Sequence, residues 1–173
     1  MSPDQRYLSP DQIAYQKAVS DYKAQADVFR NAAKAALGAD ADRAKDALCP
    51  TAMTTLQMND CVAQQNALTV ASYDAFTAAL RSLLALPQPT APGVTYPVQG
   101  INGPQAMPVS SVAAFDASES AWKVYAKAEC DAVDVHWRGG TIVSYYIGEC
   151  ALGHTRARMR ELADLYRNDL RLP

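Results

Sequence analysis

The sequence has little glycine, little net charge and no long apolar run, and each shortage excludes a class of protein. Eight glycines in 173 residues, in a chain that is 49% hydrophobic with much alanine, favour helix. A formal net charge of −2 gives no case for nucleic acid or an anionic membrane as the main partner. No apolar stretch approaches the roughly 18 residues that span a bilayer. We therefore expect a helical protein without a membrane span and without a nucleic-acid partner.

The signatures of catalysis and of metal binding are also missing. The chain has no phosphate-binding loop and no nucleophile triad, and Glu119 has no second carboxylate to complete a glycosidase pair. The cysteine spacings are C-x11-C and C-x19-C, unlike the short pairs of zinc sites, and no histidine directly adjoins either pair in the sequence. His136 and His154 could approach Cys130 and Cys150, but no nucleophile signature surrounds them. We expect no enzyme activity, no catalytic residue, no cofactor and no metal.

Capping signals and apolar spacing predict four long helices. Ser9 and Gln12 form one capping box and Thr54 and Gln57 form another. The predicted helices cover residues 10–37, 54–86, 110–136 and 148–170, with a short helix or charged linker over 39–48. Residues 87–108 contain six prolines and no charge, which predicts a loop. The expected fold is all-α, an antiparallel bundle of about four helices with a long Pro-rich loop at one hairpin tip.

The four cysteines predict two disulfides. Cys61 lies roughly 10 Å beyond the predicted cap at Thr54, and the residues that follow Cys49 can span about 13 Å, so these two cysteines can meet. Cys130 and Cys150 flank a Gly-Gly break and would tie the third helix to the fourth. A Cys61–Cys130 pairing also satisfies the geometry, but we prefer the two local pairs. A closed loop of the Cys49–Cys61 size contributes on the order of 3 kcal/mol.

Disulfides indicate a compartment outside the cytosol, which the N-terminus alone does not decide. The segment MSPDQRYLSPDQ is polar and lacks the apolar core of a leader peptide. The chain is therefore either cytosolic or a mature protein whose leader has been replaced by Met. Because disulfides persist in oxidising compartments, we expect a periplasmic or secreted protein.

Four segments together carry a resemblance to a known family: CPTAMTTLQMNDC, FDASESAWKVYAKAEC, GGT and CALGHTRARMREL. In order and spacing, they resemble the LprI-like family (DUF1311) over residues 49–165. The matching positions are Cys49, Thr54, Gln57, Met58, Cys61, Glu119, Ala121, Trp122, Cys130, Gly139, Gly140, Thr141, Cys150, Thr155 and Arg158. The chain departs from the family pattern at Tyr73, Asp74, Thr77, Ala126 and Lys127.

The resemblance implies a division of the chain and a function. Residues 1–48 would be an N-terminal helical extension that packs as one unit with an LprI-like helical domain over 49–173. A member of the family is named as a lysozyme inhibitor, so the resemblance implies a protein partner, a peptidoglycan-cleaving enzyme that is bound and occluded. Two alternatives stay open: an immunity protein against a secreted cell-wall hydrolase toxin, and a non-inhibitory envelope scaffold.

Three groups of residues are candidate sites. Tyr96, Gln99 and Asn102 in the Pro-rich loop are candidates for entering an enzyme's cleft, although a tolerated insertion explains the loop equally. An acidic face on the third helix would speed association with a cationic partner, although solubility alone accounts for it. The Glu119 carboxylate lies near the apolar seam and needs a partner, which Arg158 or Arg156 could supply. Thr155 could add a hydroxyl. We expect these residues to form a structural polar network. The acidic candidates are Asp116, Asp131 and Asp134, and the network candidates are Glu119, Thr155 and Arg158.

Overall fold

The computed structural model describes residues 8–93, 99–100, 103–104 and 110–173 and confirms the all-α prediction. The long helices are α1 (Pro10–Arg43), α2 (Thr55–Ala85), α3 (Ser111–Trp137) and α4 (Val143–Leu165), and a short helix α5 (Arg167–Leu170) follows. Within the loop between α2 and α3, β1 (Gln99–Gly100) pairs antiparallel with β2 (Gly103–Pro104). None of the described helices is both long enough and apolar enough to cross a membrane.

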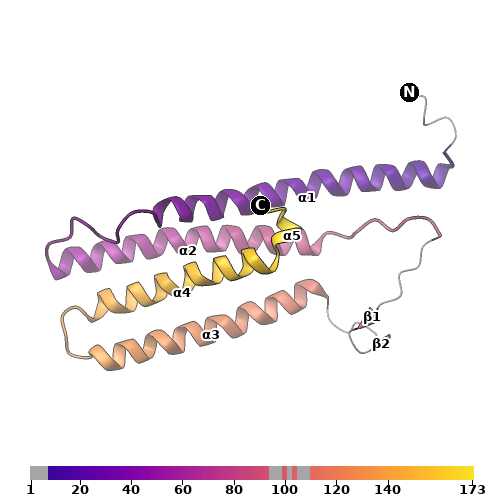
Figure 1. Cartoon of the computed structure of the whole chain (residues 1–173). Coiled ribbons are helices and arrows are strands. Elements are labelled where there is room, and N and C mark those ends of the chain that lie inside the picture. The colour runs from indigo at the N-terminus through magenta and orange to yellow at the C-terminus, as the bar shows by residue number, and fades with distance from the viewer. Residues whose placement is uncertain (1–7, 94–98, 101–102, 105–109) are drawn as a thin grey trace.

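The four long helices lie side by side, and each runs in the opposite direction to the helix before it in the chain (Figure 1). The helix α2 packs against α1 on one side and against α4 on the other, and α3 packs mainly against α4. Contacts between α2 and α3 are few, although the Pro-rich loop joins these two helices. The helices α2 and α4 therefore form the centre of the bundle.

The structure confirms both predicted capping boxes. At the start of α1 the Ser9 side chain accepts from the Gln12 N–H, and the Gln12 side chain accepts from the Ser9 N–H. Thr54 and Gln57 make the same reciprocal pair at the start of α2. These side chains satisfy N–H groups that have no partner within the helix, which sets the two helix starts.

Two predicted helix ends are wrong. The helix α1 does not stop at Gly38 but continues to Arg43, because the next turn is anchored by Asp40, which is buried and accepts from the Thr69 hydroxyl at 2.7 Å. The last helix begins at Val143 instead of residue 148 and breaks at Tyr166. Residues 142–146, IVSYY, are mostly β-branched and aromatic residues typical of strands, but Tyr146 in the first turn of α4 stacks on Trp137 with ring centroids 4.4 Å apart, and this packing favours the helix.

One continuous core runs through the bundle. The helix α1 contributes small side chains, so that it approaches α2 closely, while α2 and α4 contribute the large ones. The buried members are Ala26, Ala33, Ala36, Tyr73, Phe76, Ala79, Leu80, Leu83, Phe115, Met159, Leu162 and Leu170. Two apolar residues of α2, Leu56 and Leu68, lie outside this core and are exposed, at 70% and 43%.

The disulfides adopt the two local pairings. Cys49 bonds to Cys61 with Cα atoms 5.9 Å apart, and Cys130 bonds to Cys150 with Cα atoms 5.7 Å apart. The first holds the chain that enters α2 against the early turns of that helix, and the second joins α3 to α4. The alternative Cys61–Cys130 pairing is therefore not formed.

Gly148 provides a test of the close approach between α2 and α4. A Cβ atom at this position would lie 2.9 Å from Val62 Cγ1, whereas a Cβ atom at Gly153 on the same helix would meet nothing within 4 Å. We expect Gly148→Ala to lower the free energy of unfolding by about 1–3 kcal/mol through overpacking. Gly153→Ala should raise it by about 0.5–1 kcal/mol through helix propensity.

Urea denaturation followed by circular dichroism measures both effects. In a Val62→Ala background, the Gly148→Ala substitution should lose most of its cost because the clashing methyl groups are gone. If Gly148→Ala and Gly153→Ala change stability equally, the α2–α4 contact is not as close as described.

Candidate functional site

A buried carboxylate, Glu119 on α3, is the centre of a polar network that joins three helices. The residue is only 8% exposed. The hydroxyl of Tyr73 on α2 donates to Oε2 of Glu119. Arg158 on α4 donates to Oε1 twice, from Nε at 2.9 Å and from Nη2 at 2.6 Å. Because a buried charge without partners costs several kcal/mol, these contacts set the positions of α2, α3 and α4 relative to one another.

Arg158 is held on further sides by residues of α3 and α4. Its Nη2 donates to Ser118 Oγ at 2.6 Å, and its Nη1 lies 3.3 Å from a carboxylate oxygen of Glu161. The guanidinium carbon lies 6.0 Å from the ring centroid of Trp122, and the Trp122 ring lies 5.2 Å from that of Tyr73. Aromatic rings therefore cover the charged pair and shield it from water.

The structure brings two of the three network candidates together. Glu119 and Arg158 are paired, whereas the hydroxyl of Thr155 donates to the Ala151 carbonyl of its own helix at 2.8 Å. The hydroxyl that bonds to Glu119 comes from Tyr73, whereas it was expected from Thr155. Burial, and after it the hydrogen bond to Glu119, raise the pKa of Tyr73 above its ordinary value, so this hydroxyl remains a donor at any physiological pH.

A groove between α2 and α3 lies beside this network. Its volume is about 360 Å³, and Tyr73, Phe115 and Glu119 belong to its lining. Charged residues of both signs also line it; we call these four the groove rim: Asp74, Arg81, Asp116 and Lys123. Arg81 and Asp116 bridge the two helices with two hydrogen bonds of 2.8 Å, which lower the pKa of Asp116. The groove thus combines an apolar and hydrogen-bonded floor with a charged rim.

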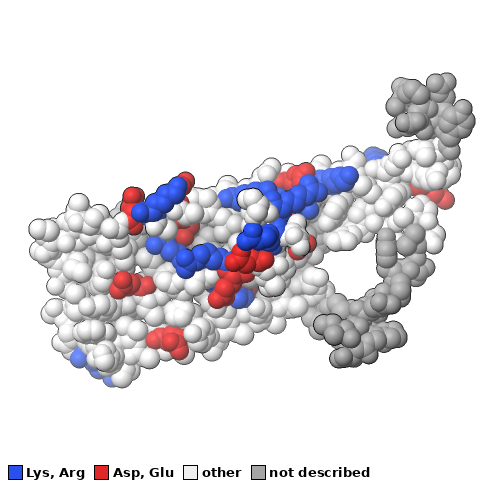
Figure 2. Space-filling model, in the orientation of Figure 1, with Lys and Arg blue, Asp and Glu red and all other residues white. Residues whose placement is uncertain are grey.

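The acidic face that was predicted on α3 is neutralised by basic neighbours. Each of its three candidate carboxylates forms an ion pair: Asp116 with Arg81, Asp131 with Lys127, and Asp134 with Arg138. Figure 2 shows acidic and basic side chains close together in the middle of one face of the molecule. The surface therefore offers a partner interspersed charges of both signs.

The loop candidates cannot be placed in the same way. Tyr96 and Asn102 lie outside the described residues. Gln99 belongs to β1, where its backbone pairs with Pro104 on β2. The loop starts from the C-terminal end of α2 and returns to the N-terminal end of α3, the two helices that form the groove.

A second buried network was not predicted. Asp40 on α1 is 6% exposed and accepts from the hydroxyl of Thr69 on α2 and from Arg43 at 3.2 Å. Arg43 also donates to Ser72 Oγ at 2.6 Å, and Arg156 Nε on α4 lies 3.3 Å from the other Asp40 oxygen. A signal was present in the sequence, because Thr69 and Ser72 are polar residues on the buried face of α2.

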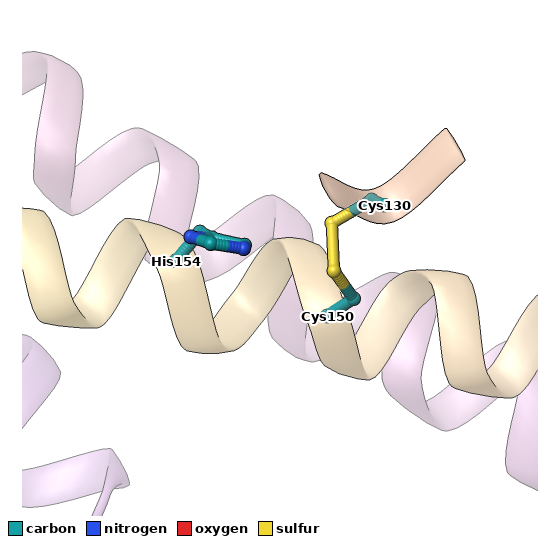
Figure 3. A group of neighbouring side chains, drawn as sticks. All are labelled: Cys130, Cys150 and His154. Carbon is teal, nitrogen blue, oxygen red and sulfur yellow. A yellow bond between two sulfur atoms is a disulfide. The ribbon is translucent and has the colours of Figure 1, made fainter. Parts of the chain in front are cut away.

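The structure places one of the two histidines, His154, beside the Cys130–Cys150 pair. Figure 3 shows His154 one turn along α4 from Cys150, next to the Cys130–Cys150 disulfide. The two sulfur atoms and a ring nitrogen of His154 all lie within 4.8 Å of one another. The signal for this neighbourhood was the spacing of Cys150 and His154, since residues four apart on a helix share a face.

The comparisons with known proteins agree with these features. A family model described as lysozyme inhibitor LprI matches residues 46–162, which hold both disulfides and the Glu119 network. The chain belongs to the LprI family. A search of curated proteins and a search of solved structures found no match.

Membership of the LprI family has consequences for compartment and partner. The family is named for inhibition rather than for catalysis, and a lysozyme inhibitor implies a protein partner. The family name and two disulfides together suggest an extracytoplasmic protein. The matched region leaves out all of α1, which nevertheless packs along α2.

The Glu119–Arg158 pair of this LprI chain provides a test of the buried network. Arg158→Met leaves a buried carboxylate without its cation, so we expect the free energy of unfolding to fall by about 3–5 kcal/mol. The matched control is Arg81→Met, which breaks an exposed ion pair with Asp116 and should cost far less stability than Arg158→Met. Equal losses in urea denaturation would show that the buried pair does not hold the helices together.

The raised pKa of Tyr73 predicts that the stability of the protein depends on pH. Its pKa is raised in the folded state above the ordinary value of 10.0, so its contribution is complete below about pH 10 and is lost as pH rises toward the folded pKa. The stability difference between the wild type and Tyr73→Phe, measured in urea, should therefore shrink above pH 10. A difference that stays constant to pH 11.5 or so would contradict the buried hydroxyl.

Proposed function

We propose that this chain is a periplasmic or secreted inhibitor that binds a peptidoglycan-cleaving enzyme of the lysozyme type and occludes its substrate cleft. The LprI family name and the two disulfides support this proposal. The chain acts by binding and carries out no chemistry of its own. The observation that carries the proposal furthest is the α2–α3 groove, which provides a preformed surface for a protein partner.

The groove suits a partner because its walls are already fixed. Tyr73, Glu119 and Arg158 hold the floor through buried hydrogen bonds, so binding orders few side chains there. A surface that is ordered before binding loses less conformational entropy on association. The exposed rim residues Asp74 and Lys123 remain available for polar contacts with the enzyme.

The Pro-rich loop extends the proposed contact surface beyond the groove. Its prolines restrict its backbone, and the connection from residue 86 to residue 110 begins and ends on the two helices that line the groove. An enzyme seated on the groove rim would contact the two helices from which the loop departs. In this arrangement Tyr96, Gln99 and Asn102 are the side chains proposed to enter the cleft, while the groove rim orients the enzyme.

Inhibition of cell-wall lysis tests the function. Lysozymes of several types should clear a peptidoglycan suspension more slowly in the presence of a molar excess of this protein, and gel filtration should show a one-to-one complex. Asp74→Lys with Lys123→Glu reverses two rim charges and should raise the concentration for half inhibition about tenfold. The matched control, Lys17→Glu with Asp21→Lys, reverses an exposed pair on α1 and should leave inhibition unchanged.

The outcomes separate the function from the location of its site. If the wild type inhibits none of the enzymes, the inhibitor function is wrong, and a dedicated toxin or an envelope protein becomes the partner to seek by pull-down. If it inhibits and the rim variant is as potent as the α1 control, the contact surface lies elsewhere on the bundle.

A further inference from the structure

We propose that the Cys130–Cys150 disulfide conceals a metal site. When the disulfide is reduced, the two thiolates and the imidazole of His154 bind a divalent cation of intermediate softness, such as Zn²⁺. This site goes beyond the inhibitor function and does not depend on it. It rests on a cluster that three side chains form on two helices, Cys130 on α3 and Cys150 and His154 on α4 (Figure 3).

The geometry needs little adjustment to accept the cation. The three ligand atoms lie within 4.8 Å of one another. Around a tetrahedral zinc ion, with bonds of about 2.0–2.3 Å, ligand atoms are about 3.4–3.8 Å apart. The sulfur atoms must separate once their bond is broken, and rotation about the side-chain bonds achieves this because the Cα atoms are already 5.7 Å apart.

The helices stay in place without the disulfide, so the ligands remain together after reduction. Glu119 and Arg158 join α3 to α4 by a buried ion pair that does not involve sulfur. Cys150 and His154 lie on consecutive turns of one helix, which fixes their separation. The His154 ring also packs edge-on against Tyr125, with centroids 5.5 Å apart, which restricts its orientation.

The ligand set resembles a reactive rather than a purely structural zinc centre. Two sulfurs and one nitrogen supply three of four tetrahedral positions, and water would take the fourth. Cys150 and His154 are half-buried, so a cation has a path from solvent to the site. The cluster is therefore sheltered enough to hold an ion and open enough to receive one.

The chemistry balances with a dithiol as the reductant. Two electrons and two protons pass to the Cys130–Cys150 disulfide and give two thiols, while the dithiol becomes a disulfide. Binding of the cation then displaces the two thiol protons. A thiolate that is bound to the cation is less free to react with an oxidant. The cation should therefore slow re-formation of the disulfide. Oxidation state and metal occupancy would thus exclude each other at this place.

The other disulfide is an internal control. Cys49 and Cys61 form a reducible pair in the same chain, but both histidines of the sequence lie elsewhere, at positions 136 and 154. In the described residues, Cys130, Cys150 and His154 form a cluster of potential metal ligands, and no such cluster surrounds Cys49. Reduction of Cys49–Cys61 should therefore create thiols without creating a comparable metal site.

Titration with Co²⁺ as a spectroscopic substitute for Zn²⁺ tests the proposal. The full chain carrying Cys49→Ser and Cys61→Ser is reduced without oxygen, freed of reductant and titrated. We expect one equivalent of Co²⁺ to bind, with a near-ultraviolet thiolate-to-cobalt band, and excess Zn²⁺ to displace it. The oxidised protein should give no such band. His154→Ala should weaken binding about tenfold or more, because a ligand is lost.

The matched comparison is the chain carrying Cys130→Ser and Cys150→Ser, reduced in the same way. Circular dichroism checks that each variant keeps its helical content. If a variant loses helical content, the reduced wild-type protein is titrated in its place. The proposal is overturned if reduced protein binds Co²⁺ no better than oxidised protein. It is equally overturned if His154→Ala has no effect, or if the Cys49–Cys61 dithiol binds as tightly.

Discussion

The fold depends on one buried carboxylate being paired from two directions. Glu119 is accommodated inside the bundle because Tyr73 on α2 and Arg158 on α4 both donate to it. Removing water from a charge is costly, and the cost is offset only when the partners are correctly placed. The network therefore selects one arrangement of the three helices. Other packings of the same apolar faces would leave Glu119 or Arg158 without a partner.

The helix α4 supplies an arginine to each of two buried carboxylates in the bundle. Arg156 and Arg158 are two residues apart, so they project from different sides of the helix. Arg156 reaches Asp40 on α1, and Arg158 reaches Glu119 on α3. A single helix thus carries the cations for two buried carboxylates that lie on opposite neighbours. This explains why α1 remains helical beyond Gly38, since its last turn holds the Asp40 carboxylate in place.

Local signals were sufficient to predict the four long helices, but not the contacts between them. Capping boxes depend on residues three apart, so Ser9 and Thr54 identified helix starts correctly. Burial depends on which face meets a neighbour, so Leu56 and Leu68, two apolar residues of the predicted helix 54–86, are exposed, while the polar Thr69 is buried against Asp40. Glu119 was recognised as needing an arginine, but its bond to Tyr73 depends on the crossing of α2 and α3, which periodicity does not contain.

The distribution of covalent links explains why the groove lies where it does. One disulfide holds the entry to α2 and the other joins α3 to α4, so neither crosses from α2 to α3. In the part of the chain that the structure describes, these two helices are linked by hydrogen bonds at Tyr73–Glu119 and Arg81–Asp116. Both links border the groove, one at its floor and one at its rim. Packing contacts between α2 and α3 are few, so polar side chains determine the width of this boundary.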